Sequence, residues 1–290
     1  MTAAIGQLSK IGIDTASPVT VRQDFQSSGL DIDETFVDGN GLRGTLSPDI
    51  SRVRTGSYRL HGGLSMQPNV LEMQQMLPWI LGTDVSGTTY ALADTAKTRY
   101  VALEFNTTTD LWTSTSVAVM SATFHAEQFS SLNLDMDLLG LTTASSGSFP
   151  AINIDVATNQ WVFTDLAVTI GGTTIAPKNF TMTVNNGLDA DWFLNSLTLS
   201  AIVKLNRVIT VGFDLSYGDY SAKFASGGSS GVAVVATFTN GVKVLTFSLA
   251  KVAAPRRPRT IARGENMFRW EGQAYWYGTT RELVTTLAVS

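Results

Sequence analysis

The chain has 290 residues, enough for one large domain or two of about 145, and only 15% of them are charged, against about 25% in typical soluble domains. It contains no cysteine, which excludes disulfides, thiolate metal sites and a cysteine nucleophile and fits an intracellular origin. The net charge of −4 argues against general affinity for nucleic acids, which depends on Lys and Arg neutralising phosphates. The opening residues "MTAAIGQLSK" show no basic region leading into an apolar stretch, so we expect no signal peptide.

The first motif along the chain, "GNGLRG" (39–44), matches the dinucleotide-binding pattern G-x-G-x-x-G. That pattern works only between a buried strand and the start of a helix. Segment 30–38 is too acidic for a central parallel strand, and Pro48 denies a following helix its first turns. The motif is therefore predicted to be a turn, and we expect no bound cofactor.

The next segment, "PNVLEMQQMLPWILG" (68–82), has the spacing of an amphipathic helix, predicted over 69–82. Pro68 suits the entry and Gly82 the end, while Pro78 predicts a kink near the last turn. The spacing predicts a packing helix that covers one face of a sheet, with its methionines in the core. The apolar positions at three- and four-residue intervals are Val70, Met73, Leu77 and Ile80.

Most of the remaining chain alternates apolar and polar residues, which is typical of strands with one buried face. In "SLNLDMDLLG" (131–140), leucines and a methionine alternate with polar side chains. Gly171-Gly172 separates two such strands, and Asn240-Gly241 predicts a hairpin with a type I′ turn. The fold class predicted is all-β with a minor helix. On segment 131–140, Leu132, Leu134, Met136 and Leu138 share one face, and Asn133, Asp135 and Asp137 share the other.

Residues suited to catalysis are few. His61 and His125 are the only histidines, and both lie in alternating, strand-like contexts where a solvent-facing or interface role is expected. Carboxylates such as Glu104, Asp110 and Glu127 show no pairing that the sequence can demonstrate. The sequence has no phosphate loop, zinc spacing or nucleophile elbow. We therefore expect no enzymatic activity and no metal.

The two halves of the chain echo each other. Asn-Gly-Leu occurs at 40–42 and again at 186–188, and each copy precedes an irregular stretch and then a strand that ends in Leu-Ser. Each half closes on a long alternating strand, "SLNLDMDLLG" and "NMFRWEGQAYW". This order favours a duplication, with tandem domains at 1–145 and 146–290. Gly41 and Gly187 would then supply the positive φ of a repeated corner.

Four segments together resemble the tail tube proteins of long-tailed bacteriophages. They are "GSYRLHGGLSMQP", "EMQQMLPWILG", "FTMTVNNGLDADWFLNSLTLS" and "ENMFRWEGQAYW". The resemblance covers most of the chain and implies β-sandwich-like tube domains, whose strands join those of neighbours into a barrel around a channel. Smaller members carry one tube domain and form hexameric rings. Larger members carry two and form pseudo-sixfold trimers, and the length and internal echo fit this second kind.

The resemblance also implies where the protein acts and with what. Its partners would be other copies of the chain in homotrimeric pseudo-hexameric rings (alternatively a homohexamer), stacked into a tube. The tape-measure protein and tail terminator would also bind, DNA would pass without specific binding, and no part would be embedded in a membrane. The location implied is the virion tail, assembled in the host cytoplasm.

Two sets of residues are candidates for the tube's surfaces. An acidic or neutral channel lets DNA slide, so the polar faces of the two closing strands are predicted to line it, although they could instead face outward. The long polar stretches 43–56 and 189–196 and the basic segment "APRRPR" are predicted to contact the adjacent ring, although they could also be solvated loops. The channel candidates are Asn133, Asp135, Asp137, Glu271 and Gln273. The stacking candidates are Arg52, Arg54, Asp189, Asp191, Arg256, Arg257 and Arg259.

Three other classes share parts of this pattern. A membrane β-barrel needs export and girdles of aromatic residues. The inner tube of a contractile or type VI secretion system shares the tail tube fold, and sequence separates the two poorly. A carbohydrate-binding all-β protein would explain the six tryptophans, but these are spread singly along the chain.

Overall fold

A computed structural model describes residues 10–15, 19, 22–23, 25–38, 53–82, 88–105, 110–145, 160–194, 196–216, 230–255 and 267–288. Strands dominate this part of the chain, which confirms the all-β prediction with a minor helix. In chain order the elements are β1 (Lys10–Asp14), β2 (Arg22–Gln23), β3 (Ser27–Ser28), β4 (Asp31–Asp38), β5 (Val53–Met66), α1 (Val70–Leu81), β6 (Thr89–Ala91), β7 (Arg99–Phe105), β8 (Asp110–Glu127), β9 (Asn133–Ser145), η3 (Phe163–Asp165), β10 (Leu166–Ile170), β11 (Thr173–Ile175), β12 (Asn179–Asn185), β13 (Leu188–Asp189), β14 (Val203–Lys204), β15 (Val208–Ser216), β16 (Val232–Asn240), β17 (Lys243–Ala253), β18 (Met267–Ala274) and β19 (Val284–Ala288).

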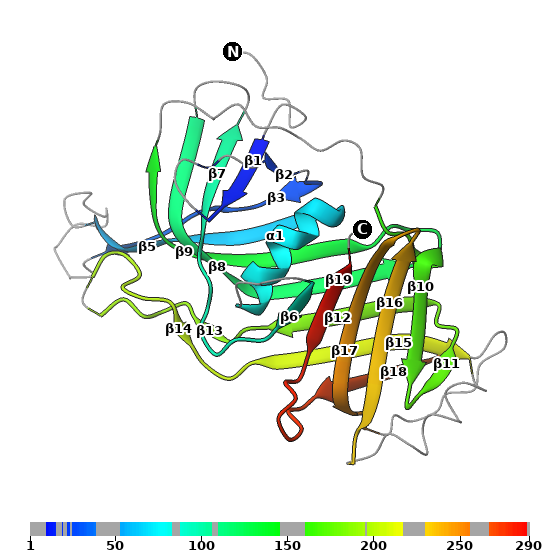
Figure 1. Cartoon of the computed structure of the whole chain (residues 1–290). Helices are drawn as coiled ribbons and strands as arrows, with labels where there is room; N and C mark the ends of the chain where they lie inside the picture. The colour runs from blue at the N-terminus through cyan, green and yellow to red at the C-terminus, as the bar shows by residue number, and fades with distance from the viewer. Residues whose placement is uncertain are drawn as a thin grey trace.

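One long antiparallel sheet runs through both halves of the chain (Figure 1). Its strand order is β4-β5-β9-β8-β12-β15-β18. The two halves join where residues 121–127 of β8 pair with residues 179–185 of β12. The sheet is not closed on itself.

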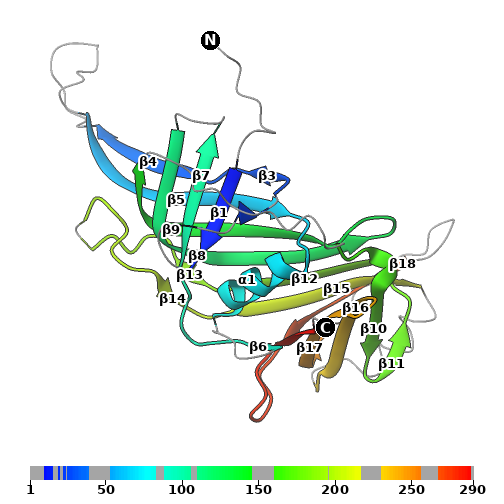
Figure 2. The same cartoon turned by 45° about the horizontal axis from the view of Figure 1, so that its top comes forward.

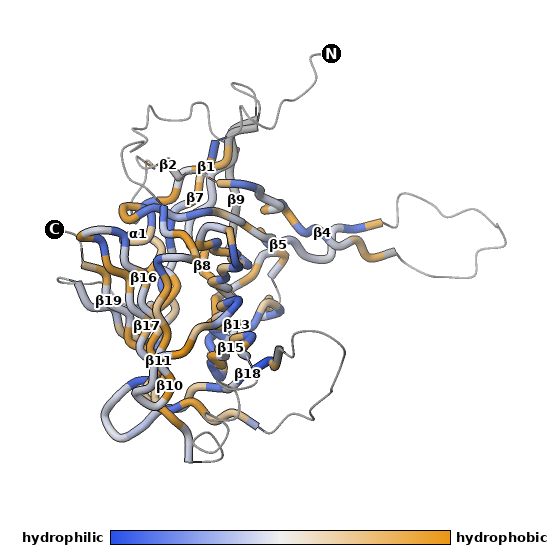
Figure 3. Tube along the Cα trace, turned by 90° about the vertical axis from the view of Figure 1, so that its right-hand side faces the viewer, coloured by the Kyte–Doolittle hydropathy of each residue, from blue (hydrophilic) through white to orange (hydrophobic). Residues whose placement is uncertain are grey.

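The other strands extend this sheet at its corners and cover it. β7 pairs with the first part of β8 and carries β1 and β2 at its outer edge. In the second half the order is β11-β10-β16-β17-β19-β6, and β17 also pairs with β18 at its end. Seen from one end, β16, β17 and β19 form one layer and β13, β15 and β18 lie opposite them (Figure 3).

Helix α1 lies across the sheet over β8 and β12 (Figure 1; Figure 2). Asn69 and Glu72 form a reciprocal capping box at its start, and Gly82 ends it in the left-handed conformation at φ +84°. The Trp79 indole N–H donates to the Val117 carbonyl of β8 at 2.9 Å, which fixes the helix on the sheet. Pro78 lies inside the last turn, as expected. The predicted helical face, Val70, Met73, Leu77 and Ile80, is buried, which confirms the packing role.

The core fills the space between the layers. Alternate residues of each strand point into it, as the period-two pattern predicted, so Leu134, Leu138, Met182 and Phe213 have no exposed surface. Its centre holds rings that contact one another at centroid distances of 4.9–6.1 Å, a spacing typical of favourable aromatic pairs. These rings belong to Phe124, Phe180, Phe213, Phe238 and Phe247.

Both predicted hairpin turns are present, but one has a different geometry. Gly171 and Gly172 both have positive φ and join β10 to β11, as a type I′ turn requires. In the β16–β17 hairpin, Asn240 pairs with Lys243, so the two loop residues are Gly241 and Val242. Only Gly241 has positive φ there, at +59°. The type I′ prediction was therefore wrong, because the register shifts the turn by one residue and places glycine where a type II′ turn needs it.

Candidate functional site

The long sheet presents one continuous polar face, because residues paired directly across strands point to the same side. One register row crosses all six strands from β5 to β18, and its side chains are all partly exposed. A second row crosses from β9 to β18. The first row is Ser65, Asp135, Thr123, Thr183, Thr210 and Gln273. The second is Asn133, His125, Thr181, Gly212 and Glu271, and we call these two rows with Asp137 the polar face.

All five predicted channel residues lie on this polar face. Asn133, Asp135 and Asp137 come from β9, and Glu271 and Gln273 come from β18, more than a hundred residues later in the sequence. Three strands separate β9 from β18 in the sheet. The sequence predicted two separate polar strands, and the register of β8, β12 and β15 brings them onto one surface.

Ion pairs with carboxylates recur along the polar face. His125 Nδ1 lies 3.3 Å from Asp135 Oδ2, and His61 Nε2 lies 3.3 Å from Asp137 Oδ1, so both histidines of the chain contact predicted channel residues. The Ser65 hydroxyl also donates to Asp135 at 2.5 Å. Further along the sheet, Arg269 lies 3.5 Å from Asp214 and 3.9 Å from Glu271. Carboxylates outnumber arginines in this group, so the face is acidic.

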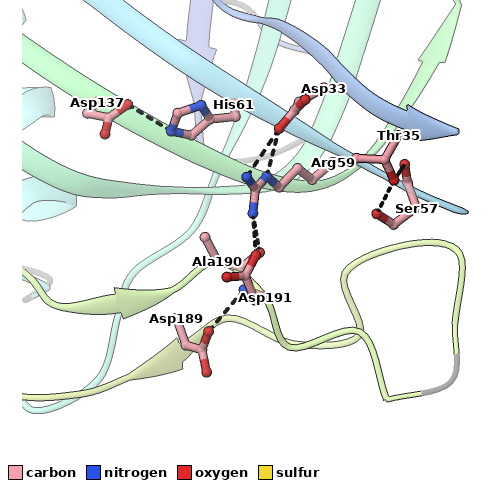
Figure 4. A network of polar contacts seen from close by, with 9 residues as sticks. All are labelled: Asp33, Thr35, Ser57, Arg59, His61, Asp137, Asp189, Ala190 and Asp191. Atoms are coloured by element: carbon pink, nitrogen blue, oxygen red, sulfur yellow. Dashed lines mark hydrogen bonds and ion pairs between the residues drawn. The ribbon is translucent and has the colours of Figure 1, made fainter. Parts of the chain in front are cut away.

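A second network, around Arg59 of β5, ties the two halves together (Figure 4). The Arg59 guanidinium donates to the Ala190 carbonyl at 2.6 Å and to Asp191 at 2.8 Å, and it lies 3.1 Å from Asp33 of β4. The Asp189 carboxylate accepts the Asp191 N–H at 2.9 Å. Two predicted stacking residues, Asp189 and Asp191, therefore belong to one turn, and Arg59 of the same chain forms an ion pair with Asp191.

Within the described ranges, no contact joins the other predicted stacking residues to the Arg59 network. Arg54 lies on β5, paired with Val37 of β4, and its side chain is exposed. Arg52, Arg256, Arg257 and Arg259 lie outside the described residues, as does the motif at 39–44. Sequence reasoning missed Arg59, because its neighbours Ser57 and His61 mark only an alternating strand and its acidic partners lie in distant segments.

The second Asn-Gly corner fixes the segment 186–207 against the first half of the chain. The buried Asn186 amide donates to the Ile80 carbonyl of α1 at 2.9 Å and to the Val119 carbonyl of β8 at 3.0 Å, and its oxygen accepts from Arg207 at 3.1 Å. Gly187 has φ +58°, and a Cβ there would lie 2.2 Å from the Asn206 carbonyl oxygen. The glycine requirement predicted at this corner is confirmed for Gly187, while Gly41 lies outside the described residues.

Replacing Asn186 with alanine is expected to lower the free energy of unfolding by about 2–4 kcal/mol, because two buried carbonyls and the Arg207 guanidinium would lose a partner. Urea denaturation followed by tryptophan fluorescence measures the change. Asn206→Ala is the matched control, since this exposed residue lies in the same segment and should change stability by less than about 0.5 kcal/mol. Equal effects of the two changes would contradict the role assigned to Asn186.

A cavity of about 490 Å³ lies beside this segment, between residues 94–98, β8, β9 and residues 200–204. Lys204 and Arg207 both donate to the Ala93 carbonyl next to it. Burial lowers the pKa of Lys204 to about 8, and the charge of Arg207 adds to this shift. The lining combines Ala96, Leu141, Ala201 and Ile202 with Asp94, Thr95, Thr98, Ser116, Ser200 and Lys204.

These features define an all-β protein with a polar sheet face and a strand, β4, that the described residues pair on one side only. The family model of the phage tail tube protein matches residues 6–272, and the chain belongs to that family. Membership gives the chain a structural role in the tail of a bacteriophage, in a tube that assembles from copies of itself, and favours a non-enzymatic function.

No curated protein matches the chain. Within the described ranges, no helix has the length and apolar content needed to cross a membrane. The same ranges contain no group of three or more histidine, aspartate or glutamate side chains placed to hold a metal ion.

Proposed function

We propose that the chain forms rings that stack into a tail tube, and that the polar face of its long sheet lines the channel. The observation that carries the proposal is the continuous register from β5 to β18, which gives one side of the sheet to polar side chains and the other to the core. An acidic face repels the phosphates of duplex DNA, and a neutral one does not bind them, so either leaves the DNA free to move. DNA in transit and the tape-measure protein would both contact this surface.

Ring closure would use the unpaired edge of β4. A free edge presents N–H and C=O groups that can pair with another chain. Phe36 and Val37 are neighbours near the end of this strand and are 64% and 59% exposed, so a chain pairing along β4 would cover apolar surface. The β4–β5 hairpin also projects from the body of the subunit (Figure 3). A neighbouring copy pairing along β4 would continue the long sheet around the channel.

The pairing order supports the proposed duplication. In the first half, β4-β5-β9-β8 takes the first, second, fourth and third of its strands in chain order. In the second half, β12-β15-β18-β17 repeats that order. The outer strands repeat as well, since β1 pairs with β7 and β7 with β8, while β10 pairs with β16 and β16 with β17. Tandem domains at 1–145 and 146–290 would place six similar units in a ring of three chains.

Electron microscopy and native mass measurement of the purified protein test this proposal together. We expect rings or tubes in the images, and a single ring of about three times 31.1 kDa. A ring of six chains would remove the duplicated, pseudo-sixfold arrangement and leave the tube. A monomer that forms neither rings nor tubes at any concentration would contradict the proposed function itself. The tail terminator, as a partner that ends tube growth, would be expected to bind only the assembled form.

A further inference from the structure

The turn between β8 and β9 has an unusual residue at its tip. The Ser130 N–H donates to the Glu127 carbonyl at 3.0 Å, which closes a four-residue turn, and the Ser130 hydroxyl accepts the Glu127 N–H at 2.8 Å. Phe129, at the third position, has φ +68°, whereas Gln128 has a negative φ. This is the pattern of a type II turn, whose third position favours glycine. The Phe129 side chain is 96% exposed.

Folding of the subunit does not account for a phenylalanine at this position. A bulky residue with positive φ is strained, and glycine would avoid that strain. The side chain gains almost nothing in return within one chain, because nearly all of its surface faces solvent. Single exposed apolar residues are common, but strain combined with full exposure at the tip of a turn points to a contact outside the subunit.

The cavity of about 490 Å³ lies along the same two strands, away from this turn. Phe129 follows the C-terminal end of β8, whereas the cavity is lined by Ser116, in the N-terminal half of β8, and by Leu141 of β9. Eleven residues separate Glu127 from Ser116, which corresponds to roughly 36 Å of strand at ~3.3 Å per residue. In Figure 1 the β8–β9 turn lies at the right of the molecule, and β13 and β14, which flank the cavity segment, lie at the left.

We propose that Phe129 of one copy inserts into this cavity of a second copy stacked head to tail, and this inference rests on the proposed tube. A head-to-tail filament needs two different, complementary surfaces at opposite ends of the subunit. The lining gives an aromatic ring the side chains of Ala96, Leu141, Ala201 and Ile202, alongside polar residues that include Asp94 and Lys204. An aromatic anchor that fills a pocket is a frequent energetic hot spot.

The first test separates stacking from folding, because one substitution should weaken tube growth without lowering the stability of the subunit. Phe129→Gly should leave the subunit equally or more stable, since glycine suits the turn, and should raise the concentration needed for tube growth at least tenfold. Gln128→Ala is the matched control in the same turn, and it should grow tubes like the original chain. Normal tube growth by Phe129→Gly would overturn the inference, as would a loss of subunit stability large enough to explain the missing tubes.

The second test uses the absence of cysteine from the chain. Cysteines introduced at Gln128 and Thr98, both exposed, leave Phe129 and the apolar lining intact. A short bis-maleimide should link the double variant into a ladder of many chains, whereas either single variant should give at most pairs. Tubes without a ladder would overturn the inference while the proposed function stands. If the unmodified protein forms no tubes, the proposed function fails and this inference fails with it.

Discussion

Replacing Asp135 and Asp137 with lysine is expected to leave tube assembly intact and to reduce DNA delivery from infecting particles at least tenfold. Both aspartates are partly exposed on the polar face of β9, so their loss removes little packing. Each contacts a histidine, and lysine would remove the carboxylate from that contact and place an ammonium group on the face instead. Every lysine repeated around and along the channel would neutralise DNA phosphates and release counterions, which holds the DNA in place.

The matched control removes the two negative charges of Asp135 and Asp137 without adding positive charges. Asp135→Asn with Asp137→Asn keeps side-chain size and leaves Asp214 and Glu271 against Arg269, so the face does not become basic and delivery should remain close to that of the original phage. Delivery is measured as plaques per particle, and assembly as the number and length of tails in electron images. Unchanged delivery with the lysine variant, in particles that have normal tails, would show that these residues do not line the channel.

Glu34→Pro is expected to prevent ring formation almost completely while the subunit still folds. The Tyr58 N–H of β5 donates to the Leu197 carbonyl, away from β4, so Tyr58 and Glu34 form a non-hydrogen-bonded pair, and the next pair, Arg59 and Asp33, exchanges backbone N–H···O=C bonds. The alternation of an antiparallel pair then directs the Glu34 N–H to the free edge of β4. Proline there removes a donor that a neighbouring chain would need, and an edge position tolerates proline within one chain.

Glu34→Ala is the control that isolates the backbone donor. It removes the same side chain, including the 3.1 Å contact with Thr55, but retains the N–H. The alanine variant should form rings and the proline variant should remain monomeric at the same concentration, as measured by light scattering. Circular dichroism should show folded protein in both. Rings formed by the proline variant would mean that β4 is not the closing edge.

Local features of the fold followed directly from the sequence. The helix could be placed because the spacing of Val70, Met73 and Leu77 and the glycine at position 82 are signals that lie within the segment itself. Strand alternation was equally local, because residues two positions apart in a strand point to the same face of the sheet, and this does not depend on which strand pairs with it. The one wrong turn type, at Gly241, depended on the register between β16 and β17, which no single segment specifies.

Long-range contacts account for what the sequence did not predict. Arg59 meets Asp33 and Asp191 only because the segment after β13 folds back against β5, and nothing near Arg59 signals this. The buried role of Asn186 depends on carbonyls of α1 and β8, both in the other half of the chain. Phe129 showed no anomaly in the sequence, since its peculiarity lies in a backbone angle that the turn imposes. The polar face could be predicted strand by strand, but not as one surface.

The orientation of the long sheet in the assembled tube is the most direct test of the proposed function. A cryo-electron microscopy reconstruction of tubes, at a resolution that separates strands, would show which side of the sheet meets the channel. We expect α1 and β16 on the outside and one register row facing the channel, namely Ser65, Asp135, Thr123, Thr183, Thr210 and Gln273. A channel lined by α1, or by the outer strands β10, β16 and β17, would contradict it.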